Sequence, residues 1–310
     1  MNDFAGKIAV ITGGGTGMGR ELARALTAAG CSVAMCDVSE ANMAETKRLC
    51  LADAPQGTMV STFKADVAIE EQINVWADAV RQDLDTDKIH LLFNNAGIGG
   101  GGGSFVAGDR AAWERTFNIC FHGVIHGVRT FLPLLKNASE GHIVNTSSVN
   151  GFWATLGPGR PHTAYSAAKF AVKGFTEALM EDLLINAPHI KCSVVMPGHI
   201  GTEIAGNSMR MQGGMANELR FALTDLGIEH ESLSDDQIIE LASANFRDTA
   251  PMSSAEAAKV ILDGVRAGKW RILVGKDAQF LDESVRADPE NAYTAGFYTM
   301  LQAGGHFPAM

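Results

Sequence analysis

The chain has 310 residues, of which 46% are hydrophobic and 19% are charged, and its formal net charge is −10. This composition is typical of a globular protein, and the length suffices for one large domain or two small ones. The acidic balance gives no electrostatic reason to bind nucleic acid or an anionic membrane, and no apolar stretch has the length of a bilayer span. The five cysteines lack metal-like spacing, which predicts no metal site and favours reduced thiols in a cytoplasmic protein.

Apolar runs and helical patterns alternate along the chain. We expect strands at residues 7–12, 32–36, 60–64, 90–94, 142–146, 191–196 and 270–274, and helices at residues 19–29, 40–51, 70–83, 110–137, 164–186 and 255–267. This alternation predicts an α/β fold with a doubly wound, mostly parallel, seven-stranded sheet that is covered by helices on both faces. One domain is expected to span residues 1–275.

Two segments depart from the alternation. Residues 203–250 are polar, contain Met and Gly, and interrupt the step from the sixth strand to the next helix. Because ligands of doubly wound sheets lie beyond the carboxyl ends of the strands, we expect this insertion to form a lid over a substrate. The alternative is a surface excursion without a role. Residues 276–310 form a C-terminal tail without a strong pattern, which either packs on a neighbouring subunit or frays.

The first predicted strand runs directly into a glycine-rich turn, and a helix follows at once. Glycines permit a tight turn and a close approach of backbone to a diphosphate, and the helix N-terminus supplies amide groups and a favourable dipole. Such a turn in the first strand-turn-helix of an α/β chain indicates a dinucleotide site. The candidate cofactor-binding residues here are Thr12, Gly13, Gly15, Thr16, Gly17, Met18 and Gly19.

An acidic residue follows each of the next two strands. Asp37, next to Val38, lies 18 residues past Gly19, where a carboxylate can accept hydrogen bonds from the adenine ribose and repel a 2′-phosphate. No Arg or Lys follows before Lys47, so the sequence favours NAD over NADP. Asp66, next to Val67, is expected to meet the adenine edge in the same way.

Tyr165 and Lys169 are four residues apart in a predicted helix, so their side chains lie on one face about one turn apart. The unperturbed pKa of a phenol is roughly 10. A neighbouring ammonium stabilises the phenolate and lowers that pKa, which allows proton exchange with a hydroxyl or carbonyl near neutral pH. The same spacing also occurs by chance in amphipathic helices, so the pair gains meaning only beside a redox cofactor.

Taken together, these motifs resemble those of the short-chain dehydrogenase/reductase family, in its compact single-domain branch. The resemblance covers residues 7–274 and adds three further motifs: Asn94-Asn95-Ala96-Gly97, Ser148 with Gly151, and Pro197-Gly198 with Thr202. It implies a Rossmann-like fold and a homodimer or homotetramer built partly on the helix that carries Tyr165.

The resemblance also implies a role for each matched residue. Tyr165 would be the general acid and base, Lys169 would lower its pKa and bind the nicotinamide ribose, and Ser148 would hold the substrate oxygen. Ser147 is expected to be structural, and Asn95 a polar brace. The implied cofactor contacts comprise Asn95, Ala96, Gly97, Tyr165, Lys169, Pro197, Gly198, Ile200 and Thr202.

Two features depart from the family pattern. Cys120 stands where the family usually has an Asn whose main-chain carbonyl holds a proton-relaying water; that carbonyl is retained, so we expect activity to persist and count Cys120 with the catalytic residues. Ser148 and Tyr165 are 17 residues apart, a longer interval than usual, and the turn-rich segment 154–162 is expected to lengthen one pocket wall. The five glycines at Gly99–Gly103 form either a mobile connector or a flap.

The sequence therefore favours an NAD(P)-dependent oxidoreductase that transfers a hydride between nicotinamide and a hydrophobic secondary alcohol or ketone. Phe152 and Trp153 either line the pocket or pack in the core, and the segment Met209–Met215 is typical of an adaptable apolar lid. Apolar pocket walls would suit a hydrophobic substrate. One alternative is a cofactor-binding sensor or scaffold with little turnover. Another is an epimerase or dehydratase on the same fold, against which the glycine spacing and the absence of a longer substrate domain argue.

Overall fold

The computed structural model describes residues 1, 3–100, 103–212 and 232–305, and its centre is one parallel sheet. Seven strands lie in the order β3-β2-β1-β4-β5-β6-β9, and every neighbouring pair is parallel. The predicted doubly wound, seven-stranded sheet is thus confirmed. The strands are β1 (Ile8–Thr12), β2 (Ser32–Asp37), β3 (Val60–Lys64), β4 (Leu91–Asn94), β5 (Gly141–Thr146), β6 (Ile190–Pro197) and β9 (Arg271–Val274).

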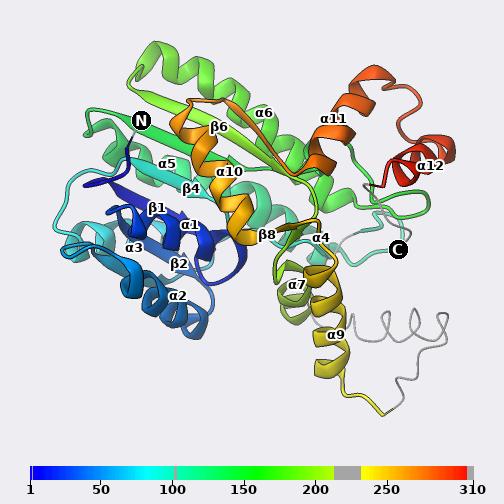
Figure 1. Ribbon diagram of the computed structural model, residues 1–310, viewed down its shortest axis with the longest axis horizontal. Coiled ribbons are helices and arrows are strands. Elements are labelled where there is room, and N and C mark those ends of the chain that lie inside the picture. Colours follow the sequence, from blue (N-terminus) through cyan, green and yellow to red (C-terminus); the bar gives the residue numbers. More distant parts are fainter. Residues whose placement is uncertain (2, 101–102, 213–231, 306–310) are drawn as a thin grey trace.

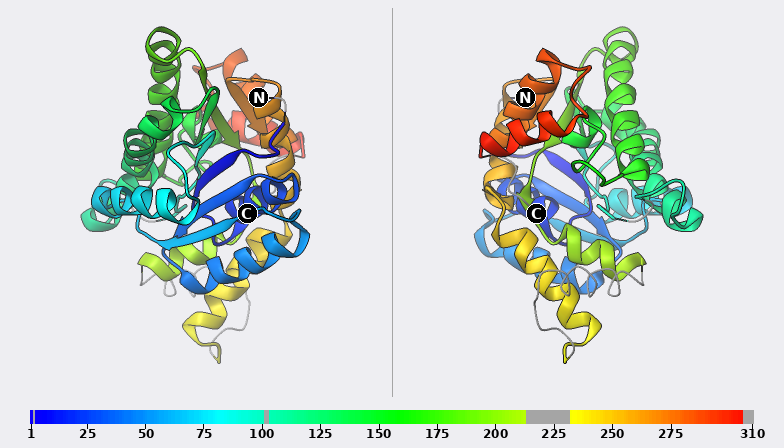
Figure 2. Two further views of the ribbon diagram at one scale, coloured as in Figure 1. Left: turned by 90° about the vertical axis from the view of Figure 1, so that its left-hand side faces the viewer. Right: turned by 90° about the vertical axis from the view of Figure 1, so that its right-hand side faces the viewer.

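Helices cover both faces of the sheet (Figure 2). One layer contains α1 (Gly17–Ala28), α2 (Glu40–Asp53) and α10 (Ser254–Arg266), and the opposite layer contains α3 (Glu70–Asp83), α4 (Arg110–Phe117), α5 (Gly123–Lys136) and α6 (Thr163–Asn186). Two large apolar clusters fill the space between the sheet and these layers. Burial of one such side chain, for example Phe131, stabilises the fold by roughly 1.5–3 kcal/mol.

The strand order reverses beside β1, where β2 pairs with one edge and β4 with the other. The loops after β1 and β4 diverge there to opposite faces, which creates a crevice at the carboxyl ends of the strands. The two elements of the insertion that are described, α7 (Ile204–Gln212) and α9 (Asp235–Asp248), project from this end of the sheet (Figure 1). A small two-stranded sheet of β7 (Ile200–Gly201) and β8 (Met252–Ser253) joins the base of the insertion.

The predicted continuous helix at 110–137 is wrong in its middle. A π-helical turn, η1 (Asn118–His122), separates α4 from α5, and the amide of Gly123 donates to the carbonyl of Asn118 five residues earlier. Hydrophobic periodicity does not distinguish one wide turn from an α-helical turn, so the sequence pattern did not reveal it. Such turns occur frequently at functional sites, and this one contains Cys120.

The C-terminal segment, for which the sequence showed no strong pattern, contains two helices, α11 (Lys276–Ala287) and α12 (Ala295–Ala303). They lie near the same end of the molecule as the insertion (Figure 1). Leu281, Phe297 and Leu301 surround Trp153, which follows the short 3₁₀ helix η2 (Val149–Gly151), so this segment packs on its own chain. Among the described residues, no helix is both long enough and apolar enough to cross a membrane.

Candidate active site

The glycine-rich turn is held in place by the strand next to it. The hydroxyl oxygen of Thr12 accepts hydrogen bonds from the amides of Asn95 and Ala96, each at 3.0 Å, and the Asn95 side chain donates to the carbonyl of Thr12 at 3.1 Å. Asn95 is thus the brace that the sequence predicted. Gly13 has φ +68°, and a Cβ there would lie 2.8 Å from the Cα of Ala96, so the turn fits only glycine at this position.

The turn leads into the N-terminus of α1. Thr16 is the N-cap of this helix, but its side chain makes no capping bond; instead its oxygen lies 3.2 Å from the side-chain amide of Asn207, which donates to it. Gly17 has φ +54°, and a Cβ on Gly19 would overlap the carbonyl of Gly13. The first amides of α1 therefore face a site that backbone can approach closely, which suits a diphosphate.

The two predicted acidic residues lie beside this turn. Asp37 accepts from the amides of Gly15 and Ser39, both at 3.0 Å, so its carboxylate is fixed at the carboxyl end of β2. Asp66 accepts from the amide of Ala68 at 3.0 Å and pairs with Arg115 at 2.7 Å. Both oxygens of Asp66 thus have protein partners, and an adenine would have to share them.

A cavity of about 410 Å³ joins these features. Its lining contains twelve of the predicted cofactor residues: Gly13, Thr16, Gly17, Met18, Asp37, Val38, Asp66, Val67, Asn95, Ala96, Gly97 and Thr202. The glycine turn, the uncapped helix terminus and the fixed carboxylate around one cavity are the groups that a nicotinamide dinucleotide needs. The other eight predicted cofactor residues lie outside this lining, and they are Thr12, Gly15, Gly19, Pro197, Gly198, Ile200, Tyr165 and Lys169. Of these, Thr12, Gly15 and Gly19 support the lining from behind.

Sequence reasoning missed several residues that line the cavity. These include Ser39, Asn42, Ile98 and Ile119, and the cavity is also lined by four residues of the insertion that was expected as a lid, namely Ile204, Asn207, Arg210 and Met211. The last four belong to α7, which also donates from Asn207 to Thr16, while Ser208 accepts from the amide of Gly99 at 2.8 Å. The polar character of the insertion indicated a lid, but nothing in the sequence predicted the hydrogen bonds from Asn207 to Thr16 and from Gly99 to Ser208. Residues 213–231 of the expected lid, including Met215, lie outside the described residues.

Ser148, Tyr165 and Lys169 come together beyond the carboxyl end of β5. Ser148 caps η2 by accepting from the amide of Asn150 at 3.1 Å, and its side chain hydrogen-bonds Tyr165. The Lys169 ammonium lies 5.4 Å from the centroid of the Tyr165 ring and donates to the carbonyl of Thr146 at 2.8 Å. Ser147 instead donates to the carbonyl of Lys169 at 2.7 Å, which is the structural role predicted for it.

The electrostatics of the pair differ from the sequence expectation. Burial raises the pKa of Tyr165 well above its ordinary value, a negative charge on Cys120 would raise it further, and the hydrogen bond with Ser148 partly opposes both. Burial also lowers the pKa of Lys169, with Cys120 acting in the opposite direction. In this arrangement, desolvation of the phenol outweighs the lowering expected from Lys169, so the pKa of Tyr165 is raised.

Cys120 lies next to this pair, inside the π-helical turn. Its side chain is fully buried, and its sulfur is 3.4 Å from the carbonyl of Ile98. A Cβ on Gly97 would lie 3.5 Å from the Lys169 ammonium and 3.7 Å from the Cys120 sulfur, so Gly97 in the loop after β4 lies close to both groups.

The loop after β4 is tied to its neighbours at the glycines that are described. The carbonyls of Gly99, Gly100 and Gly103 accept hydrogen bonds from His162, Thr116 and Thr163, respectively. These contacts hold the run at three of its five glycines, and the choice between a mobile connector and a flap stays a prediction. Gly101 and Gly102 lie outside the described residues.

The loop after β6, which contains Gly198 and His199 and would reach the nicotinamide, is held by the C-terminal segment. The amide of His199 donates to Asp277 at 2.6 Å, and the His199 side chain lies 2.7 Å from the carbonyl of Phe246 in α9. A Cβ on Gly198 would overlap the Asp277 carboxylate, which is only 2% exposed. The sequence offered no signal for Asp277, because it is 78 residues from His199 and lies in the segment without a pattern.

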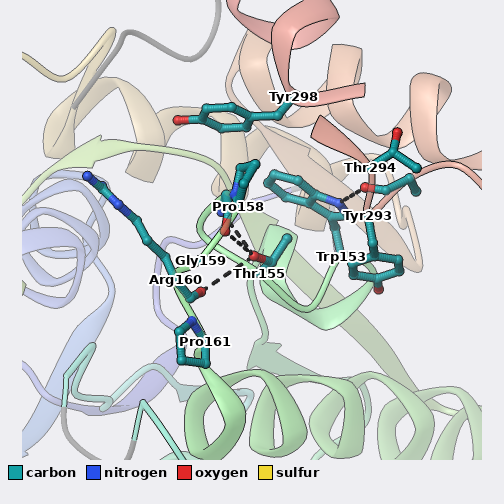
Figure 3. Close-up of a pocket in the computed structure, with 11 residues that line it drawn as sticks. Trp153, Thr155, Pro158, Gly159, Arg160, Pro161, Tyr293, Thr294 and Tyr298 are labelled. Carbon is teal, nitrogen blue, oxygen red and sulfur yellow. Dashed lines mark hydrogen bonds between the residues drawn. The ribbon is translucent and has the colours of Figure 1, made fainter. Parts of the chain in front are cut away.

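The longer interval between Ser148 and Tyr165 forms a second cavity, of about 310 Å³, against the C-terminal segment (Figure 3). Trp153 donates to the carbonyl of Ala292 at 2.7 Å, and Tyr298 packs over Gly157 on the opposite side. Segment 154–162 lines this cavity, but Ser148 and Tyr165 do not, so its expected place in the wall of the substrate pocket stays a prediction. Its far end, His162, stacks on Tyr165 instead, with ring centroids 4.7 Å apart.

The site and the fold agree with known proteins. The family model for short chain dehydrogenases matches residues 7–213, two thirds of the chain. A protein of Mycobacterium tuberculosis named as the oxidoreductase SadH is 37% identical over 92% of both chains, and levodione reductase of Leifsonia aquatica is 31% identical over 67% of this chain and 74% of its own. The crystal structure of a short-chain dehydrogenase/reductase from Burkholderia phymatum in complex with NAD has a TM-score of 0.76 at 28% identity, covering 95% of this chain and 98% of that one.

The family match includes the glycine turn, Ser148, Tyr165 and Lys169, all of which lie in the arrangement described above. The chain is therefore an oxidoreductase of the short-chain dehydrogenase/reductase family.

Proposed function

We propose that this protein is an NAD-dependent alcohol dehydrogenase or ketone reductase that acts on a hydrophobic secondary alcohol or ketone. The observation that carries the proposal is the convergence of Ser148, Tyr165 and Lys169 at the strand end next to a cavity that contains the glycine turn and Asp37. The resemblance of the fold to a relative solved in complex with NAD supports it.

The bound nicotinamide would supply or accept the hydride, and the chain's own residues would handle the oxygen and its proton. Tyr165 gives its phenolic proton to the carbonyl oxygen during reduction and takes the hydroxyl proton during oxidation. Ser148 donates a hydrogen bond to the same oxygen and stabilises the charge that develops on it. Lys169 donates to the carbonyl of Thr146, and its remaining N–H groups would bind the nicotinamide ribose.

The preference for NAD rests on Asp37. Its carboxylate is oriented by two backbone amides beside the glycine turn, so it is placed to accept from ribose hydroxyls. A 2′-phosphate at that position would be repelled by a fixed negative charge. Arg20, in the first turn of α1, donates to the carbonyl of Gly15 and to Thr46, so its guanidinium is held at the glycine turn.

The substrate class rests on the surroundings of the site and on a relative. Trp153 lines the second cavity, and Ile204 and Met211 of α7 line the dinucleotide cavity. Levodione reductase, by its name, reduces a dione. We infer that α7 and α9 form the base of a lid over this substrate, supported by the contacts from Asn207 to Thr16 and from Gly99 to Ser208.

We further infer a homo-oligomer built partly on α6. This helix exposes Phe170 at 42%, Leu184 at 67% and Ile185 at 78% of their surfaces. Exposed apolar side chains gathered on one helix are typical of an interface. Light scattering of the purified protein should find a particle of two or four chains.

The test of the activity is a steady-state assay with NAD and NADP across a panel of secondary alcohols and ketones, comparing wild type with Tyr165→Phe. We expect turnover in the wild type and a loss of several orders of magnitude in the variant, with NAD affinity retained. NAD binding without turnover on the whole panel would instead support a cofactor-binding sensor or scaffold.

A further inference from the structure

His162 occupies a position that the family motifs do not assign. It ends the 154–162 segment, precedes Tyr165 by three residues and is the N-cap of α6. Its side chain is 7% exposed, and its ring lies nearly parallel to that of Tyr165, at an interplanar angle of 20° and a centroid distance of 4.7 Å. The imidazole therefore covers one face of the phenol that is to transfer the proton.

The same imidazole is fixed at its other end by the loop after β4. Its Nε2 lies 2.9 Å from the carbonyl oxygen of Gly99, and because a carbonyl only accepts, Nε2 carries the proton. Burial lowers the pKa of His162, so the ring is neutral. Among the described residues its Nδ1 has no hydrogen-bond partner, which makes the Gly99 carbonyl the polar anchor of the ring.

Gly99 is also the point at which α7 contacts this loop. The Gly99 amide donates to the Ser208 hydroxyl at 2.8 Å, and Ser208, only 2% exposed, donates in turn to the carbonyl of Ile204 in its own helix. The backbone carbonyl and amide of one residue thus bind His162 on one side and Ser208 on the other. Both side chains are buried, where breaking a hydrogen bond leaves a polar group without water.

We propose that His162 is a positioning residue that couples α7 to Tyr165 through Gly99. With α7 seated on the Gly99 amide, the Gly99 carbonyl fixes the imidazole, and the imidazole fixes the plane of the phenol for proton transfer. The catalytic consequence rests on the proposed function, in which Tyr165 exchanges the proton. The physical coupling between α7 and the Tyr165 ring does not depend on it.

Two single variants and their combination test the coupling. His162→Phe keeps a flat ring on Tyr165 but removes the donor to Gly99, and Ser208→Ala removes the hydroxyl at the other end. His142→Phe is the matched control: His142 is also a buried histidine with an unpartnered Nδ1 among the described residues, but it lies at the start of β5, away from the carboxyl ends of the strands. Thermal unfolding of each variant shows that it is folded.

The kinetic readout is the split between kcat and the KM for NAD. We expect His162→Phe to lower kcat roughly 10- to 100-fold, because a misplaced reacting group costs about that much, while the KM for NAD changes less than about twofold. If the two side chains act through Gly99, the double variant loses less than the product of the single losses. A multiplicative loss would overturn the coupling, and so would wild-type kcat in His162→Phe.

The second readout needs no turnover. The chain has three tyrosines, so ring-¹³C-tyrosine labelling gives three sets of NMR signals, and Tyr165→Phe identifies those of Tyr165. We expect the Tyr165 signals to shift in both His162→Phe and Ser208→Ala and to stay in place in His142→Phe. Unmoved Tyr165 signals in Ser208→Ala would overturn the coupling even if His162→Phe were unstable. A wild type without turnover but with this pattern would refute the proposed function and leave the coupling supported.

Discussion

Asp277 fills the space in which a side chain on Gly198 would lie, and it accepts the amide of the next residue, His199, at 2.6 Å. Asp277 is the second residue of α11, where the positive end of the helix dipole favours a carboxylate. The C-terminal segment, which lies beyond the part of the chain that the family model matches, therefore holds the loop that the motif places at the nicotinamide.

Replacing Asp277 should loosen this loop. Asp277→Ala leaves the part-buried amide of His199 without this acceptor, and we expect a loss of about 1–3 kcal/mol in the free energy of unfolding together with a several-fold higher KM for NAD. Asp277→Asn keeps an acceptor oxygen and should lie between wild type and Asp277→Ala. Denaturant unfolding and NAD-dependent kinetics measure the two effects. An unchanged KM for NAD in Asp277→Ala would show that the loop does not need this anchor.

Neutralising Asp37 should weaken the preference for NAD. Asp37→Asn keeps an acceptor for one of its two backbone amides but removes the charge that repels a 2′-phosphate, so we expect kcat/KM to fall about tenfold with NAD and to rise with NADP. Asp53→Asn is the control, because it makes the same change of charge at the end of α2. The proposed preference would be refuted if the ratio of the two kcat/KM values moved equally in both variants.

Removing the sulfur of Cys120 should shift the pH profile of alcohol oxidation. A negative charge on Cys120 raises the pKa of both Tyr165 and Lys169. Oxidation needs the base form of Tyr165, so its rate rises with pH, and Cys120→Ala should move the midpoint of that rise to lower pH. Cys192→Ala, in β6, removes another buried thiol and should leave the midpoint in place. A midpoint that stays or rises in Cys120→Ala would contradict this role.

His142 should make the fold sensitive to acid. Burial lowers its pKa from 6.5 to about 3, so between these values the unfolded chain binds a proton that the folded chain does not. Stability therefore falls as the pH decreases from 6.5 toward 3, by at most a few kcal/mol from this group. Denaturant unfolding between pH 4 and 7 should show a flatter pH dependence in His142→Phe than in wild type. Parallel curves for the two proteins would contradict the prediction.

Local patterns predicted the fold and most of the motif residues. Strand and helix runs repeat at fixed spacings, and a turn that only glycine fits appears directly in the sequence, as Gly13 and Gly19 show. The π-helical turn around Cys120 left no such trace, because its apolar residues fit an α-helical stripe almost equally well. The helices of the C-terminal segment were missed because their burial depends on contacts with Trp153, more than a hundred residues away.

The sequence by itself determined that Tyr165 and Lys169 share a helix face and that a glycine turn and Asp37 follow the first two strands, because neighbours within an element are set by its geometry. Only the tertiary structure decided what surrounds them. Burial raises the Tyr165 pKa, and the Lys169 ammonium donates to the carbonyl of Thr146. His162 stacks on the phenol and hydrogen-bonds the carbonyl of Gly99. Desolvation and long-range hydrogen bonds arise from the packing of distant segments, and no local spacing encodes them.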